Sequence, residues 1–176
     1  MRFTRLELDD AVLVQFEPHR DERGLFARSY CAREFAAAGL PTHWPQMNVS
    51  GNRQAGTLRG MHFQHPPHEE PKLVRCTRGA ILDVIIDLRP GSPSLHRHVA
   101  VRLEADTGDA LYVPPGFAHG FQTLMDETDV LYLMGAEFEP AAQAGVRWND
   151  PAFGIDWPLP VTAISPRDAA YPDARG

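Results

Sequence analysis

The sequence predicts an all-β domain, either a barrel or a sandwich. Sixteen prolines and fourteen glycines interrupt its 176 residues, and the runs between them are short and rich in β-forming residues. One segment has a helical pattern, and no repeat, low-complexity stretch or linker divides the chain. A chain of this length is sufficient for one domain with its own core, which we expect to span residues 1–176.

The expected elements follow this punctuation from the N-terminus. Residues 11–17 and 25–30 favour strands on either side of a charged turn, HRDERG. Residues 31–40 form the helix candidate, and Gly39 suits its C-terminal end. Roughly ten strands are expected in total. The later ones are predicted at 46–52, 57–63, 72–89 (two strands around a turn at Gly79), 96–105, 110–116, 120–125 and 129–138.

Two further features concern burial. Val84, Ile85 and Ile86 form a nearly continuous apolar run, which is expected of a strand buried on both faces. The tail from Trp148 is rich in proline and irregular, and we expect it to wrap around the outside of the strands.

Composition and charge exclude several classes of protein. The net charge of −6 argues against nucleic-acid binding, although basic residues gathered in a pocket can still bind an anionic small molecule. No apolar run approaches the roughly 20 residues of a transmembrane helix. The first residues carry charges inside their apolar run and lack a small-residue cleavage site, so no signal peptide is expected. Cys31 and Cys76 are expected to be reduced packing residues of a cytoplasmic protein.

Two stretches carry the chemistry, and we interpret them as two halves of one pocket. The first, residues 56–79, concentrates Arg59, histidines and Lys72. The second, residues 108–121, places Gly108, Pro114, Gly116 and His119 at the G-x5-P-x-G-x2-H spacing of a cupin motif. A strand there turns tightly at the prolines and returns with His119 directed into the barrel mouth.

The first stretch does not have the usual metal pattern. Metal-binding cupins have a His-x-His pair, whereas here His62 is followed by Gln64. This disfavours a metal, and we expect none, although His62, Glu70 and His119 together still offer three ligands. His65 and His68 lie in the proline-rich segment HPPHEEP and are expected to be exposed loop residues.

The residues of these stretches suit proton transfer. A histidine titrates near neutrality and can accept a proton at working pH. Lys72 supplies a cation for an enolate oxygen, and Tyr132 can act as a general acid. Asp168 can orient His62. Taken alone, Tyr132 is equally expected as a core aromatic and Asp168 as a surface carboxylate of the tail.

A set of segments spread over most of the chain resembles one known family. The chain is similar to the dTDP-4-dehydrorhamnose 3,5-epimerases, a metal-independent cupin family. The resemblance implies a double-stranded β-helix, the cupin jelly-roll barrel, with a few short helices. The matching segments are DERGLF, QMNVS, LRGMHFQ, PKLVRC, GAILDVIIDLRPGSP, VPPGFAHGF, VRWNDP, IDWP and ISPRD.

The resemblance also implies an activity without a cofactor. Enzymes of this family invert C3 and C5 of a nucleotide-diphospho-4-keto-6-deoxyhexose, and both carbons are acidified by the C4 ketone. By resemblance, His62 removes the protons, Asp168 pairs with it, and Lys72 lies near the C4 oxygen. Asp83 is expected to hold Lys72, and Tyr132 is expected to deliver a proton on the opposite face.

The substrate-binding set also comes from the resemblance. Arg23, Arg59 and His119 match diphosphate- and sugar-binding residues, Gln46 and Asn48 match polar contacts, and Phe26 matches an aromatic near the nucleotide. The family forms homodimers in which an N-terminal segment reaches the site of the partner.

Four positions of the sequence depart from the usual family pattern. Arg28 and Gln143 replace glutamates, Phe138 replaces a tyrosine, and Arg167 replaces a lysine. By resemblance, all four belong to the nucleotide or phosphate end of the site. The proton-transfer residues are therefore unchanged, whereas the nucleotide (dTDP, CDP, GDP or UDP) stays open.

Three alternatives remain at this point. The protein can be a mono-epimerase or isomerase of another nucleotide sugar, a metal-dependent cupin enzyme such as a dioxygenase, or a sugar-nucleotide-binding protein without activity.

Overall fold

The structure is a computed structural model that describes residues 1–174, which contain thirteen strands and two short helices. In chain order the elements are β1 (Arg2–Arg5), β2 (Val12–Gln15), β3 (His19–Asp21), β4 (Gly24–Phe26), α1 (Ala32–Ala37), β5 (Gln46–Asn52), β6 (Leu58–Gln64), β7 (Lys72–Arg78), β8 (Ala80–Asp87), β9 (His98–Glu104), β10 (Ala110–Val113), β11 (Phe117–Thr123), β12 (Thr128–Met134), β13 (Gln143–Gly145) and α2 (Pro166–Ala169).

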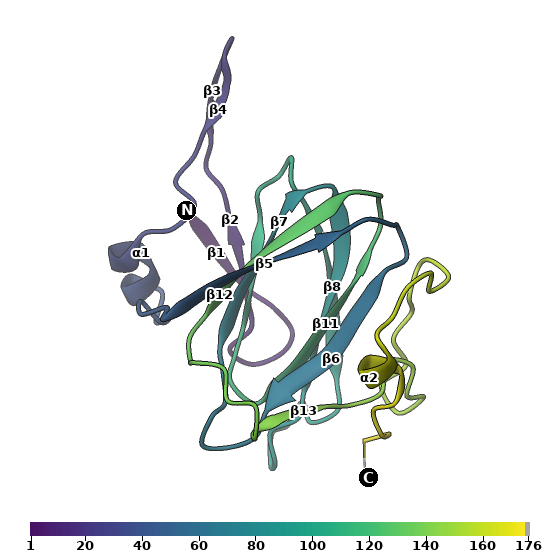
Figure 1. Cartoon of the computed structure of the whole chain (residues 1–176). Helices are drawn as coiled ribbons and strands as arrows, with labels where there is room; N and C mark the ends of the chain where they lie inside the picture. The colour runs from purple at the N-terminus through teal and green to yellow at the C-terminus, as the bar shows by residue number, and fades with distance from the viewer. Residues whose placement is uncertain (175–176) are drawn as a thin grey trace.

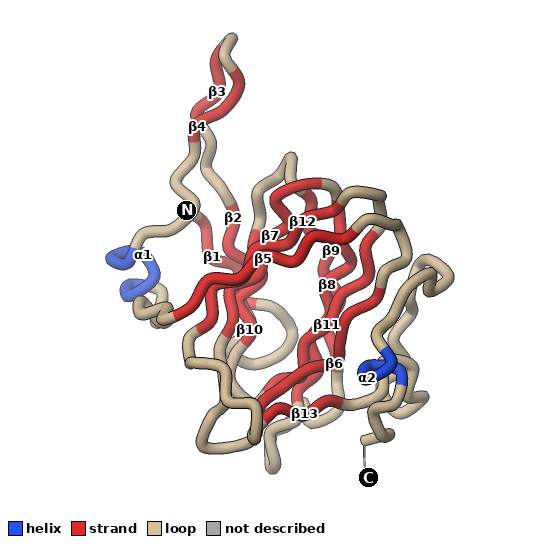
Figure 2. The backbone as a smooth tube through the Cα atoms, viewed as in Figure 1, coloured by secondary structure: helices blue, strands red, loops and turns tan. Residues whose placement is uncertain are grey.

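Two antiparallel sheets face each other and form a jelly-roll barrel (Figures 1 and 2). The first has the order β1-β2-β10-β7-β12-β5, and the second has the order β13-β6-β11-β8-β9. The predicted all-β class with few helices is therefore confirmed. Neither helix in the described part of the chain has the length and apolar character needed to cross a membrane.

Three apolar clusters hold the barrel together, one inside it and two on its outer faces. Ile85 belongs to the inner cluster, between the sheets. Its neighbours Val84 and Ile86 belong to the cluster that the C-terminal tail covers, through Phe153 and other residues. All three are fully buried, so the predicted strand with two buried faces is confirmed. The expected packing of the tail on the outside of the barrel is confirmed as well.

The third cluster lies under helix α1. Phe35 is fully buried there and contacts the rings of Phe3 and Tyr30, with centroid distances of 5.4 and 4.8 Å. The helix ends as predicted, because Gly39, just beyond its C-cap, adopts a φ of +75°.

The segment around the predicted charged turn differs from the prediction. Residues 17–28, here called the arm, contain the hairpin β3–β4, which projects away from the barrel (Figure 1). The predicted strand 25–30 ends at Phe26, and the charged segment before it contributes strand β3. Every residue of both strands is exposed, so the sequence has no buried periodicity from which to predict them.

The base of the arm is attached to the barrel by Arg75 of β7. This buried guanidinium donates a hydrogen bond of 3.0 Å to the Ser29 carbonyl and lies 4.4 Å above the ring centre of Phe16. Ser29 and Phe16 follow and precede the arm, so one side chain contacts both of its ends. Burial lowers the pKa of Arg75 to about 10, and the nearby Asp109 partly offsets this effect.

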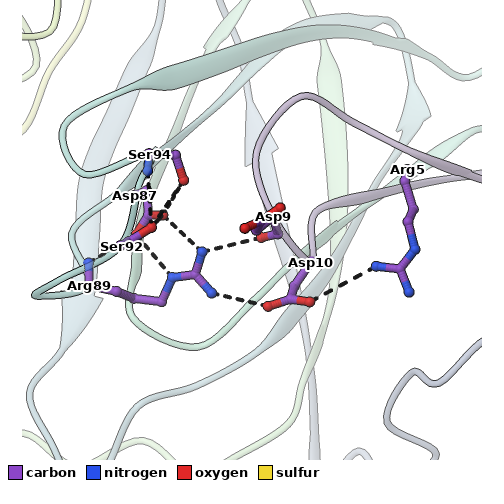
Figure 3. A network of polar contacts seen from close by, with 7 residues as sticks. All are labelled: Arg5, Asp9, Asp10, Asp87, Arg89, Ser92 and Ser94. Atoms are coloured by element: carbon purple, nitrogen blue, oxygen red, sulfur yellow. Dashed lines mark hydrogen bonds and ion pairs between the residues drawn. The ribbon is translucent and has the colours of Figure 1, made fainter.

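A buried polar network joins the loop after β8 to the loop before β2 (Figure 3). Asp87 is fully buried and accepts hydrogen bonds from Arg89 and from the hydroxyls of Ser92 and Ser94, at 2.6 to 3.0 Å. Arg89 continues to Asp10 at 3.1 Å. Burial opposes ionisation of Asp87, but its arginine and serine partners outweigh burial and hold its pKa well below the usual range.

Three short elements were not predicted. β1 is a mostly exposed edge strand, β13 has three residues, and α2 lies inside the tail that was expected to be irregular. The sequence does contain the start signal of α2, because Ser165 caps the helix, Pro166 occupies its first turn and Asp168 stands three residues after the cap.

Candidate active site

The candidate site is a cavity of about 300 Å³ between the two sheets. Strands β5, β6, β7, β11, β12 and β13 all contribute side chains to its wall. The lining residues are Gln46, Asn48, Val49, Ser50, Arg59, His62, Phe63, Gln64, Glu70, Lys72, His119, Phe121, Tyr132, Met134, Phe138 and Gln143. The two sequence stretches interpreted as halves of one pocket therefore border the same cavity.

Two glycines bring strands β6 and β11 into close contact beside this cavity. Gly60 has a φ of +128°, and a Cβ on it would lie 2.5 Å from the Cα of Gly120. The register of the two strands shifts at this point, and just beyond it His62 lies directly opposite His119. The predicted glycine bend is therefore present, and it aligns the two histidines of the site.

His62 forms a pair with Asp168. Its Nε2 lies 2.9 Å from Asp168 Oδ1, while Oδ2 of the same carboxylate accepts the Gly60 amide at 3.0 Å. Asp168 is positioned by the cap of α2, where its backbone N–H donates to Ser165 Oγ at 3.0 Å. The pairing expected between His62 and Asp168 is present.

The electrostatics of the pair define which ring nitrogen is free. Burial opposes ionisation of Asp168, but hydrogen bonds from His62 and from the Gly60 amide outweigh it and hold its pKa below the ordinary value. An ionised carboxylate only accepts hydrogen bonds, so it keeps the proton of His62 on Nε2. Nδ1 is then the nitrogen that can accept a proton from a bound molecule.

A second His–Asp pair lies deeper in the barrel and corrects one prediction. His119 Nε2 is 2.7 Å from Asp83 Oδ1, and both side chains are almost completely buried. Asp83 was expected to hold Lys72, which is wrong, because Lys72 instead pairs with Glu70 at 3.1 Å. Lys72 belongs to β7 in one sheet and Asp83 to β8 in the other, so the two residues belong to different walls of the barrel.

Tyr132 of β12 borders the same cavity as His62. Its ring packs against the inner cluster and lies edge-on to His119, with the ring centroids 5.9 Å apart. Burial raises the pKa of Tyr132 well above its ordinary value, and the charge of Asp83 adds to this, while Arg59 opposes it. The phenol is therefore protonated at neutral pH and available as an acid.

Polar residues line the mouth of the cavity. A second hollow of about 510 Å³ adjoins the first, and Arg59, His62 and Gln143 border both. Arg59 is oriented by a hydrogen bond of 2.8 Å from its Nε to Asn52 Oδ1. Arg167 lies in the second hollow and donates to the side-chain oxygen of Gln143.

Of the predicted binding residues, Gln46 and Asn48 also line the first cavity. Arg23, Phe26 and Arg28 do not reach either hollow within the chain. Phe26 lies on the arm with 79% of its surface exposed, Arg23 pairs only with Asp21 at the tip, and Arg28 pairs with Glu34 of α1. One copy of the chain therefore does not assemble the whole predicted binding set.

The metal-ligand candidates have other partners. His62, Glu70 and His119 bind Asp168, Lys72 and Asp83 respectively. Among residues 1–174, no group of three or more His, Cys, Asp or Glu side chains is arranged to hold a metal ion. His65 and His68 are exposed, as expected.

Sequence reasoning missed some contributors to the site. Glu70 was considered only as a metal ligand, although it stands two residues before Lys72, a spacing that puts both on one side of an extended chain. Tyr171, which packs edge-on against His62 with centroids 5.9 Å apart, gave no recognisable pattern.

A jelly-roll barrel that combines a His–Asp pair, a lysine and a protonated tyrosine in one cavity defines an isomerase of the cupin-type epimerase class. The family model described as dTDP-4-dehydrorhamnose 3,5-epimerase matches residues 5–175. The chain belongs to this family, as the sequence segments predicted.

Individual relatives agree with this assignment. The dTDP-4-dehydrorhamnose 3,5-epimerase of Sinorhizobium fredii is 39% identical over 98% of this chain and 89% of its own length. A crystal structure of the Bacillus anthracis enzyme with TDP and PPi bound matches with a TM-score of 0.95 and 37% identity, and covers 98% of this chain and 99% of the other. The dTDP-4-dehydrorhamnose 3-epimerase of Streptomyces niveus is 37% identical over 96% of this chain and 81% of its own.

Proposed function

We propose that this chain converts dTDP-4-keto-6-deoxyglucose to dTDP-4-dehydrorhamnose by inverting C3 and C5 through an enolate. The family assignment supports the substrate. One observation carries the mechanism: the His62–Asp168 pair, Lys72 and the protonated Tyr132 border one cavity.

In the proposed reaction, Nδ1 of His62 removes the proton from C3 or C5, which the C4 ketone acidifies. Charge develops on the C4 oxygen, and the ammonium of Lys72 stabilises it. Tyr132 returns a proton to the opposite face of the same carbon, which inverts the centre. His62 is then protonated and Tyr132 is an anion, so both groups exchange a proton with water before the next step.

The nucleotide end of the substrate is assigned to the mouth of the cavity. Arg59 and Arg167 offer planar guanidinium groups that suit diphosphate oxygens, and Gln46, Asn48 and Gln143 offer polar contacts. Because two of these positions depart from the usual family pattern, dTDP should be compared directly with the CDP, GDP and UDP sugars.

The arm is proposed to complete the site of a second copy in a homodimer. Arg23, Phe26 and Arg28 are exposed on a hairpin that projects from the barrel, which suits contact with another subunit (Figure 1). Light scattering of the intact chain and of a chain lacking residues 18–28 tests this. The proposal requires a dimer that binds dTDP, and loss of the arm should weaken dTDP binding.

A mono-epimerase is the second candidate, because one relative at 37% identity carries that name. The cytoplasm is the proposed compartment, where the free Cys31 and Cys76 stay reduced.

Proton exchange in D2O tests both candidates. The substrate is incubated with enzyme, and a downstream reductase traps the product for NMR. Deuterium at C3 and C5 supports the double inversion, whereas label at one carbon alone supports the mono-epimerase. The variant H62A should lose exchange at both carbons while it still binds dTDP, and substantial residual exchange would contradict the role of His62.

A further inference from the structure

The segment that follows helix α2 lies against the imidazole of the candidate base. Tyr171 packs edge-on against His62, with ring centroids 5.9 Å apart and an interplanar angle of 73°. Asp168, the hydrogen-bonding partner of His62, stands three residues earlier in the same segment. The C-terminal part of the chain thus supplies two of the contacts of His62.

Strand β13 leaves room for this ring. Gly145 is the register partner of His62, and a Cβ on Gly145 would lie 2.4 Å from Cε2 and 2.5 Å from Cζ of Tyr171. Any side chain larger than glycine would therefore displace the ring from His62.

Backbone contacts fix the segment beyond Tyr171. The Arg147 amide donates to the Pro172 carbonyl at 2.9 Å, and the Ala174 amide donates to Asp150 Oδ2 at 2.7 Å. Arg147 also pairs with Asp173 at 2.6 Å. These contacts hold the chain immediately after Tyr171, so its ring has a defined place.

The hydroxyl group is not what holds Tyr171. Its oxygen is buried and has no hydrogen-bond partner of ordinary geometry among residues 1–174, although the charge of Arg167 is nearby. Tyr171 also borders neither of the two hollows of the site. Its connection to the site is therefore the contact of its ring with His62.

We propose that Tyr171 is a positioning residue whose ring keeps the His62 imidazole in the orientation that binds Asp168 through Nε2 and presents Nδ1 to the substrate. The inference rests on the proposed function, in which His62 is the base. A small displacement of a catalytic group can reduce the rate strongly, because proton transfer depends on near-attack geometry. Edge-to-face contacts of this kind stabilise one arrangement of two rings.

Two variants separate the ring from its hydroxyl. In Y171L the flat ring is lost, and we expect kcat for exchange at C3 and C5 to fall about tenfold, equivalent to about 1.4 kcal/mol. KM should stay within about twofold, since Tyr171 does not border the cavity. Y171F retains the ring and should keep the kcat of the natural sequence. Equal losses in Y171F and Y171L, or an unchanged kcat in Y171L, would overturn the proposal.

A matched control is available in the same tail. Phe153 packs edge-on against His96, with centroids 6.0 Å apart and an interplanar angle of 77°, and neither residue borders the site. F153L should lose comparable packing and keep its kcat. A fall in kcat equal to that of Y171L would identify a general packing effect and overturn the positioning role.

NMR of the free protein distinguishes failure of this inference from failure of the proposed function. Nitrogen-15 shifts of the His62 ring report which nitrogen carries the proton. We expect one tautomer in the natural protein and in Y171F, and averaging of the two in Y171L. If the natural protein fails to catalyse exchange, the proposed function fails, and these spectra still test the role of Tyr171. Identical His62 spectra in all three proteins would refute it.

Discussion

Replacing Asp168 by asparagine tests the chemistry of the His62 pair directly. The two side chains are nearly the same size, and Asp168 is only 4% exposed, so the fold should survive. The carboxylate accepts from His62 through one oxygen and from the Gly60 amide through the other. An asparagine has one acceptor oxygen, and if Gly60 keeps it, the amide NH2 faces the imidazole.

That amide donates where the carboxylate accepted, so it favours the tautomer with the proton on Nδ1. His62 then presents an N–H to the substrate and cannot act as a base. Loss of a general base typically costs a factor of about 10²–10⁴. We therefore expect D168N to lower kcat by at least about 100-fold, with KM changed less than about threefold. The cost in stability should be about 1–3 kcal/mol, the penalty for one buried partner left unsatisfied.

The assay is deuterium incorporation at C3 and C5 under saturating substrate, with thermal unfolding measured in parallel. D87N is the control, because Asp87 is also a buried acceptor but borders neither hollow. It should lose more stability than D168N and retain kcat at a temperature where both are folded. A kcat for D168N within tenfold of the natural sequence would refute the tautomer argument.

Three further changes address other parts of the molecule. Y132F should slow epimerisation more than it slows proton loss, because the phenol acts on the return step; equal slowing would reduce Tyr132 to a packing residue. D87N should cost about 3–5 kcal/mol of unfolding free energy at pH 7, since it leaves a buried arginine unpaired. The pKa of Asp87 is lower in the folded state, so its contribution is present above about pH 4 and is lost as the pH falls below that. Urea titrations from pH 7 to pH 3 should therefore show a stability gap between D87N and the natural chain that narrows with acid, and a constant gap would exclude this cause. R75M should raise hydrogen exchange in residues 17–28 and weaken dTDP binding about tenfold, whereas R78M, on the exposed part of the same strand, should do neither.

The barrel was predictable because its strands carry the required patterns locally. The run around Ile85 indicates a strand with two buried faces, and the prolines before Gly116 indicate where a strand turns. The arm lacked such a pattern, since backbone pairing alone forms β3 and β4 in a segment that is exposed on both sides. Its role also depends on a second copy, which no local pattern in one chain reveals.

The contacts of the site were only partly predictable, for a related reason. Sequence spacing places Lys72 and Asp83 on successive strands, but those strands belong to different sheets. The real partners are two residues away for Lys72 and on a neighbouring strand for Asp83, which binds His119. The His62–Asp168 contact spans 106 positions, and only the family resemblance could indicate it.

The two His–Asp pairs differ in exposure, and this difference bears on which histidine is the base. His62 and His119 are opposed on adjacent strands, and each binds a buried aspartate. The side chain of His62 is 34% exposed and borders both hollows, whereas that of His119 is 4% exposed. Each inversion leaves the base protonated, and it must lose that proton to water before the next carbon reacts. A base sealed inside the barrel would retain it, so we infer that His62 turns over while His119 and Asp83 form the fixed floor on which the sugar rests. H119N, which keeps a hydrogen-bonding side chain, should therefore raise KM more than it lowers kcat, and the opposite result would exchange the two roles.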